Sequence, residues 1–183
     1  MDRRLIELAQ GGDRDAFAGL VHAFGDRLYG LAFRILRDPH LAQDAYQEAM
    51  IAAWRQLPNL RDPDRFDAWV RQILVHACYA ESRKRTKWTT NVRVLEIEES
   101  PLVDAGHTIH DREALEQAFR ALTLEQRAVF VLHHHQGVPL VEIAETLGIP
   151  AGTARSRLHY ATQALRKAIE AADAMGTARE RTA

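Results

Sequence analysis

The sequence predicts an all-α protein made of two small helical domains joined by a flexible linker. Apolar residues recur every three or four positions through most of the 183 residues, which is the period of an amphipathic helix. No alternation of polar and apolar residues persists, as it would in a half-buried strand. The helical period fades where small polar residues and four acids gather. The predicted parts are a first domain at 1–88, a linker at 89–110, a second domain at 111–175 and a disordered tail at 176–183.

The composition limits the possible functions. Apolar residues make up 46% of the chain, enough for a core, and the formal net charge of −1 argues against a protein that coats DNA non-specifically. The single cysteine, Cys78, excludes an intrachain disulfide and fits a reducing compartment. No apolar run approaches the roughly 20 residues of a membrane span, and the N-terminal residues lack the apolar core of a signal peptide. We therefore expect a cytoplasmic protein without membrane insertion.

Local signals divide the first domain into helices. Gly11-Gly12 ends a short helix, and Asp13 is suited to cap the next one, which stops at Asp38-Pro39. A loop rich in turn-forming residues, 58–64, precedes the last helix of the domain. The helices are expected at residues 2–10, 14–37, 39–57 and 66–88. The inward positions of the fourth helix are expected to be Phe66, Trp69, Val70, Ile73, Leu74, Ala77 and Cys78.

The second domain opens on similar signals. Asp111 is a candidate N-cap for its first helix. Thr123 and Gln126 then fit a capping box, in which each residue bonds the backbone of the other at a helix start. Gly137 is expected to end that helix, because glycine readily adopts the left-handed conformation found there.

A helix-turn-helix pattern completes the second domain. Pro139 is expected to begin a short helix that Gly148 ends, and Ile149-Pro150 precedes a longer helix. From Ala154 to Lys167 this longer helix carries four positive charges and no acid. A helix with one apolar and one basic face suits the major groove of DNA, although a solvated amphipathic helix looks the same in isolation. The preceding short helix and glycine turn favour the helix-turn-helix.

These features together resemble the bacterial sigma-70 family, and specifically compact sigma factors of the extracytoplasmic function (ECF) group, which keep the second and fourth conserved domains. The resemblance covers nearly the whole chain and implies a region 2-like and a region 4-like domain. Four stretches carry it: Asp44-x-x-Gln47-Glu48 with Trp54-Arg55; Phe66-x-x-Trp69-Val70-x-x-Ile73 ending in Arg83-Lys84-Arg85; Ala121-Leu122-Thr123-x-x-Gln126-Arg127; and Gly152-Thr153-Ala154-Arg155-Ser156-Arg157-Leu158-His159.

The resemblance implies that one helix face binds core RNA polymerase, by docking on the clamp-helix coiled coil of the largest subunit. This face consists of Asp44, Gln47, Glu48 and Ile51. Carboxylates suit arginines on a partner helix, and an isoleucine beside them offers an apolar anchor. Outside the family context, charges at this spacing more often form a solvated helix surface.

The resemblance also implies that the first domain captures the melted −10 strand of the promoter. A basic track joined to polar and aromatic groups suits single-stranded DNA. His76 stands where the family usually has asparagine, so the base preference there is open. The implied −10 residues are Asn59, Gln72, His76, Tyr79, Arg83, Lys84 and Arg85.

In the second domain, the resemblance implies that the long helix reads the −35 duplex. Arg155 is the leading candidate for base reading. Tyr160 stands where a basic residue is common, which would cost a phosphate contact. The implied −35 residues are Thr153, Arg155, Ser156, Arg157, His159, Tyr160 and Arg166.

The partners implied are core RNA polymerase and promoter DNA, and the family also suggests an anti-sigma protein that holds the free factor inactive. The acidic linker either mimics nucleic acid within the polymerase or serves as a tether, and the sequence leaves both open.

The sequence also bears on two other function classes. An enzyme or metal site finds little support, because consecutive residues such as His133, His134 and His135 point about 100° apart on a helix. No metal-binding or phosphate-binding motif accompanies them, so no cofactor, metal or catalytic residue is expected. The alternative function is a stand-alone helix-turn-helix regulator of duplex DNA. Tight, specific binding to DNA without polymerase would favour this regulator.

Overall fold

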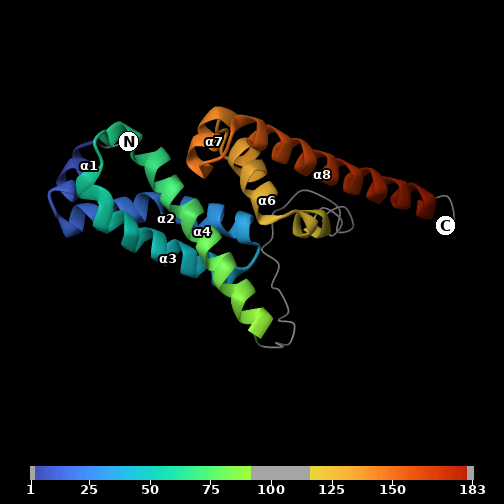
Figure 1. The fold of residues 1–183 in the computed structure, drawn as a ribbon, viewed down its shortest axis with the longest axis horizontal. Helices are drawn as coiled ribbons and strands as arrows, with labels where there is room; N and C mark the ends of the chain where they lie inside the picture. The colour runs from blue at the N-terminus through green and yellow to red at the C-terminus, as the bar shows by residue number, and fades with distance from the viewer. Residues whose placement is uncertain (1–2, 92–115, 181–183) are drawn as a thin grey trace. The chain divides into compact units, whose positions relative to one another are not determined.

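The computed structural model describes residues 3–91 and 116–180, and it describes side chains for 3–86 and 116–171. Those residues form helices and turns without any strand, which confirms the all-α fold class (Figure 1). The chain separates into two compact units, unit 1 at Met1–Glu96 and unit 2 at Ile97–Ala183. Every helix that the model describes is too short or too polar to cross a lipid bilayer.

Two of the three long helices described in unit 1 begin on a capping aspartate. The Asp13 carboxylate accepts hydrogen bonds from the backbone N–H groups of Asp15 and Ala16, which confirms the predicted N-cap. Asp38 caps the following helix in the same way, at the N–H groups of His40 and Leu41. The elements of unit 1 are α1 Arg3–Gln10, α2 Arg14–Leu36, α3 Pro39–Gln56, the 3-10 turns η1 Leu57–Asn59 and η2 Pro63–Arg65, and α4 Phe66–Asn91.

Small residues bring the helices of unit 1 close together. The inner side of α3 is a row of fully buried alanines, so α3 packs against both α2 and α4. The row consists of Ala42, Ala45, Ala49 and Ala53. From α4, the buried residues are Phe66, Val70, Leu74, Val75 and Cys78. Three other positions predicted to point inward, Trp69, Ile73 and Ala77, are only half-buried, because they line a groove described below.

Unit 2 follows the predicted signals closely. The Thr123 hydroxyl accepts from the Gln126 N–H at 3.2 Å and the Gln126 amide oxygen accepts from the Thr123 N–H at 3.0 Å, which confirms the capping box. Gly137 and Gly148 end helices with φ values of 67° and 63°. After a helical segment at 116–121, the elements are α6 Leu124–Phe130, a π-helical turn η3 Val131–His135, α7 Leu140–Leu147 and α8 Ala151–Glu180.

Several bounds differ from the expectation. Pro139 occupies the N-cap position before α7, without a side-chain cap hydrogen bond, instead of forming its first residue. α4 continues to Asn91 and α8 to Glu180, so residues 89–91 and 176–180 are helical where a linker and a disordered tail were predicted. Neither extension contains a proline, and the alanine-rich end of α8 has high helix propensity, which outweighs the cost of about 1 kcal/mol for its glycine. The candidate cap Asp111 and most of the predicted linker lie outside the described residues.

Candidate functional site

The four predicted polymerase-binding residues share one solvent-facing side of α3. Asp44, Gln47, Glu48 and Ile51 are all exposed, opposite the buried alanine row. Ile51 exposes 47% of its surface and so offers apolar area to a partner. Two carboxylates beside an exposed isoleucine form a surface suited to a partner with basic and apolar side chains.

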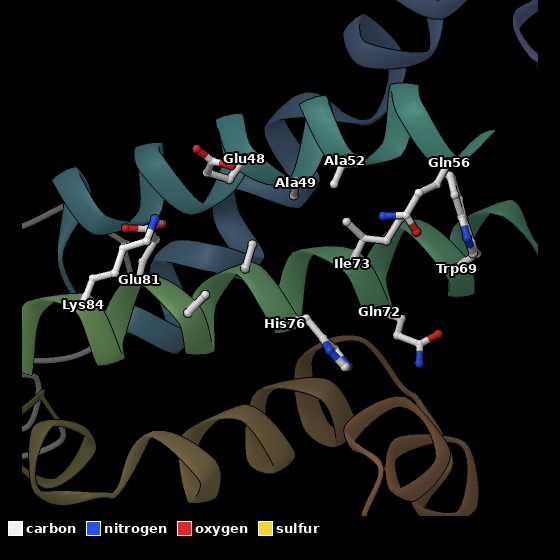
Figure 2. A pocket seen from close by; sticks show the side chains of 12 residues that line it. Glu48, Ala49, Ala52, Gln56, Trp69, Gln72, Ile73, His76, Glu81 and Lys84 are labelled. Carbon is white, nitrogen blue, oxygen red and sulfur yellow. Dashed lines mark hydrogen bonds and ion pairs between the residues drawn. The ribbon is translucent and has the colours of Figure 1, made fainter. Parts of the chain in front are cut away.

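A groove of about 500 Å³ runs between α3 and α4 next to this surface. Figure 2 shows Lys84 and Glu81 at one end and Gln56 and Trp69 at the other, while Gln72 and His76 point away from α3. Alanines from both helices leave the space that forms the groove. Its lining residues are Glu48, Ala49, Ala52, Gln56, Trp69, Gln72, Ile73, His76, Ala77, Ala80, Glu81 and Lys84. The groove therefore joins the predicted polymerase-binding face, through Glu48, to the predicted −10 surface.

The predicted basic track on α4 is largely engaged in ion pairs within unit 1. The Lys84 ammonium donates to the Glu81 carboxylate at 2.6 Å, and Glu81 is only 7% exposed. Arg85 pairs with Asp38 at the start of α3. Arg83 is exposed and forms no ion pair within the described residues. Of the three predicted track residues, Arg83 thus offers its charge most directly to DNA.

The surroundings of Lys84 favour its charged form. The hydrogen bond to Glu81 and the negative charge of that carboxylate raise the pKa of the Lys84 ammonium, and the charges of Glu48 and Asp44 act in the same direction. Lys84 therefore interacts electrostatically with the acidic α3 face as well as with its own helix. The sequence shows that Glu81 and Lys84 are three residues apart, a spacing that allows an ion pair on a helix. It does not show that Lys84 bonds Glu81 instead of remaining available to DNA.

The remaining −10 residues differ in exposure. Asn59, at the end of η1, is exposed, as are Gln72 and His76 on α4. Tyr79 is half-buried and its hydroxyl oxygen is buried, so it presents less surface to a nucleic acid than its neighbours on the helix.

The predicted −35 surface lies on α8. Five of its residues, Arg155, Ser156, His159, Tyr160 and Arg166, are exposed, whereas Thr153 and Arg157 are half-buried. The opposite side of α8 is buried at Ala154, Ala161 and Leu165. The rings of His159 and Tyr160 lie 5.8 Å apart edge to face, and the Ser156 hydroxyl bonds the Thr153 carbonyl at 3.0 Å. Within the described part of unit 2, Arg155, Arg157 and Arg166 form no ion pairs.

Two of the three consecutive histidines, His133 and His134, contact neighbouring residues of unit 2. A ring nitrogen of His133 lies 3.1 Å from the Val138 carbonyl, and the His134 ring packs on Phe130 with centroids 4.6 Å apart. Burial lowers the pKa of His134. Elsewhere, burial raises the pKa of the Cys78 thiol to about 12, so this thiol is protonated at neutral pH. Within the part of the chain that the structure describes, no cluster of histidine, cysteine or acidic residues could hold a metal ion.

Comparisons with known proteins match both units. The family model for sigma-70 region 2 matches residues 20–88, and the model for sigma-70 region 4 matches residues 118–167. An RNA polymerase sigma-E factor of Streptomyces coelicolor is 32% identical over 170 residues, covering 90% of this chain and 92% of the relative. The ECF RNA polymerase sigma factor SigW of Bacillus subtilis is 29% identical over 92% of this chain and 97% of its own length.

Solved structures share the fold. The sigma factor RpoE of Bartonella quintana, in complex with the anti-sigma factor NepR, matches with a TM-score of 0.71 at 22% identity, over 84% of this chain and 96% of that one. CnrH, in complex with the cytosolic domain of CnrY, matches with a TM-score of 0.63 at 24% identity, over 93% and 97%. The sequence matches to both conserved regions and to full-length relatives show that this chain belongs to the ECF group of the sigma-70 family of RNA polymerase sigma factors.

Proposed function

We propose that this chain is a promoter-specificity subunit that binds core RNA polymerase, recognises promoter DNA and directs transcription initiation. Sigma factors are not enzymes, and we infer that this chain makes and breaks no covalent bond. The observation that carries the proposal is the pairing of two different exposed surfaces. An acidic face with an apolar anchor lies on α3, and a basic face lies on the second helix of a helix-turn-helix. Such a factor acts where the polymerase acts, in the cytoplasm.

Binding to polymerase is assigned to Asp44, Gln47, Glu48 and Ile51. Both carboxylates are exposed on one side of α3, and Ile51 supplies apolar area beside them. A cationic side chain of the polymerase would form charge-assisted hydrogen bonds there, while Ile51 would be removed from water. This contact would supply most of the affinity of the complex.

Capture of the melted −10 strand is assigned to the end of η1 and the outer side of α4. Asn59, Gln72 and His76 present polar side chains to solvent, and Arg83 presents a positive charge. Lys84 and Arg85 would have to exchange their carboxylate partners for phosphates, so we assign them a smaller share. Tyr79 is assigned a supporting position beneath this surface because of its buried hydroxyl.

Reading of the −35 duplex is assigned to the exposed side of α8. Arg155 is the proposed base reader, since a guanidinium can bond two acceptors of a guanine at once. Arg166 lies further along the same helix and suits the phosphate backbone. Ser156, His159 and Tyr160 complete the exposed surface, and the half-buried Thr153 and Arg157 flank it.

We also propose a protein partner that competes with polymerase. Two solved structures with the same fold are complexes, one with an anti-sigma factor and one with the cytosolic domain of CnrY. The α3 face and the adjoining groove expose apolar area next to charge in this chain. A partner covering this region would block the polymerase-binding face and part of the −10 surface together.

Transcription in vitro tests the proposed function. Core polymerase with this chain is expected to produce transcripts from a subset of a promoter library, and core polymerase alone is expected to produce none of them. A library in which this chain enriches no promoter would contradict the proposal. The enriched sequences would also identify the bases read at −10 and −35.

A further inference from the structure

We propose that Gln10 of α1 is a positioning residue for −10 recognition: it holds the loop at residues 57–65 in the conformation in which Asn59 meets the DNA strand. This inference rests on the −10 role proposed above for Asn59. Helix α1 lies before residue 20, where the match to the region 2 family model begins. The inference therefore assigns a recognition role to a helix outside the matched region.

The side-chain amide of Gln10 bonds the loop at two points. Its nitrogen donates to the backbone carbonyl of Leu60 at 2.7 Å and to that of Leu57 at 3.3 Å. These two carbonyls lie on either side of Pro58 and Asn59 in the chain. A single half-buried amide group thus fixes both ends of the short turn whose last residue is Asn59.

Two buried residues also hold the same loop in place. Leu57 is fully buried, and Pro63, at the start of η2, is buried as well. Between them, Pro58, Asn59, Arg61 and Asp62 are exposed, so the loop presents polar side chains from a buried base. A binding side chain on a loop keeps a defined position only when neighbouring groups lock the backbone that carries it. Gln10 is such a group.

A second contact from α1 reaches the other end of the loop. The Arg3 guanidinium bonds the Asp64 carboxylate at 2.9 Å, and Asp62 caps η2 by accepting from the Asp64 N–H at 3.0 Å. Arg3 and Asp64 are both well exposed, so this ion pair contributes little by itself. Gln10, which is half-buried and bonded twice, is expected to contribute more to the position of the loop.

Gln10→Met tests the inference, because methionine keeps the length of the side chain and removes the donor. Gln10→Lys restores a donor of similar reach. Leu8→Ala is the matched control, since Leu8 is exposed on the same helix and forms no hydrogen bond to the loop through its side chain. Amide hydrogen exchange of residues 57–65 is measured in the free chain. The preference among the four bases at each −10 position is measured by transcription with core polymerase from premelted templates.

In Gln10→Met, we expect the loop amides to exchange about 5- to 150-fold faster, which corresponds to the two lost hydrogen bonds of Gln10. The preference for the best −10 base over the others should fall by a similar factor at one position, while affinity for core polymerase stays unchanged. Gln10→Lys should restore both quantities and Leu8→Ala should change neither.

Unchanged exchange of the loop in Gln10→Met would overturn the inference. Faster exchange with an unchanged base preference would overturn it too, and would show that the loop lacks the −10 role assigned to it. Failure of the whole proposed function looks different: the wild-type chain would then support no transcription with core polymerase, while exchange in the free chain would still report on Gln10.

Discussion

The two surfaces assigned to DNA differ in how they hold their positive charges. On α4 of unit 1, Lys84 and Arg85 are paired with Glu81 and Asp38. On α8 of unit 2, Arg155 and Arg166 are exposed and form no ion pair within the described residues. A paired cation must give up a carboxylate before it binds a phosphate, so its net gain from DNA is smaller by up to about 1 kcal/mol.

This difference indicates when each surface acts. The α8 face offers few charges, but they are available to duplex DNA at once. On the α4 surface two of the three assigned cations are paired, which suits a strand that is already melted and held close by the polymerase. Neither surface is strongly basic. The affinity of this chain for a promoter should therefore come mainly from the polymerase bound at the α3 face.

The largest effect is expected from reversing the charge of the α3 face. Asp44→Arg combined with Glu48→Arg should weaken binding to core polymerase by about 2–5 kcal/mol, because both carboxylates would be replaced by charges that repel the partner's cations. Competition between labelled wild-type and variant chains for core polymerase measures this loss.

Asp15→Arg combined with Asp26→Arg is the control for that experiment, since it changes the net charge equally and both aspartates are exposed on α2 rather than on the α3 face. It should leave the affinity for polymerase nearly unchanged. Equal losses in the two variants would mean that net charge, rather than the α3 face, determines binding.

An intermediate effect is expected on α8. Arg155→Ala should reduce the preference for a matched −35 element over a scrambled one by about 1–3 kcal/mol, because a bidentate base contact is lost. Arg83→Ala serves as the comparison and should leave this preference intact. Run-off transcription measures the ratio of transcript from the matched template to transcript from the scrambled one. An equal loss on both templates would show that Arg155 does not read a base.

The smallest effects are expected on α4, where Arg83 forms no ion pair within the described residues and Lys84 is paired with Glu81. Arg83→Ala should reduce the salt dependence of holoenzyme binding to premelted −10 DNA by about 0.7 in logarithmic slope, the value for one single-strand phosphate contact. Lys84→Ala should reduce the slope less, because Lys84 is already paired with Glu81.

Thermal unfolding should show the opposite order. Lys84→Ala leaves the buried Glu81 carboxylate without its ion pair, so it should lower the melting temperature more than Arg83→Ala does. If Lys84→Ala changed the salt slope more than Arg83→Ala did and left the melting temperature unchanged, Lys84 would contact DNA directly.

Local chemistry explains which parts of the fold the sequence predicts well. Asp13, the Thr123–Gln126 box and Gly148 act on neighbouring backbone groups, so their spacing alone identifies helix ends. The ends of α4 and α8 were less predictable, because no strong stop signal follows either helix and propensity alone determines how far each continues.

Contacts between distant residues explain what the sequence did not predict. Trp69 and Ile73 have the period of core residues, but small side chains on α3 leave them at the edge of a groove. The bond from Gln10 to Leu60 spans 50 residues, so no local pattern indicates it. The exposure of the α3 and α8 faces, by contrast, was predictable from helical period, whereas their functional assignment depended on the family resemblance.

DNA binding with and without polymerase tests whether the α3 face supplies affinity while α8 supplies the choice of promoter. A labelled promoter duplex is titrated with the free chain, with core polymerase, and with both together, using matched and scrambled −35 elements. We predict weak and unselective binding by the free chain, and tight binding that favours the matched element only when core polymerase is added. Tight, selective binding by the free chain alone would contradict the account and indicate a stand-alone regulator.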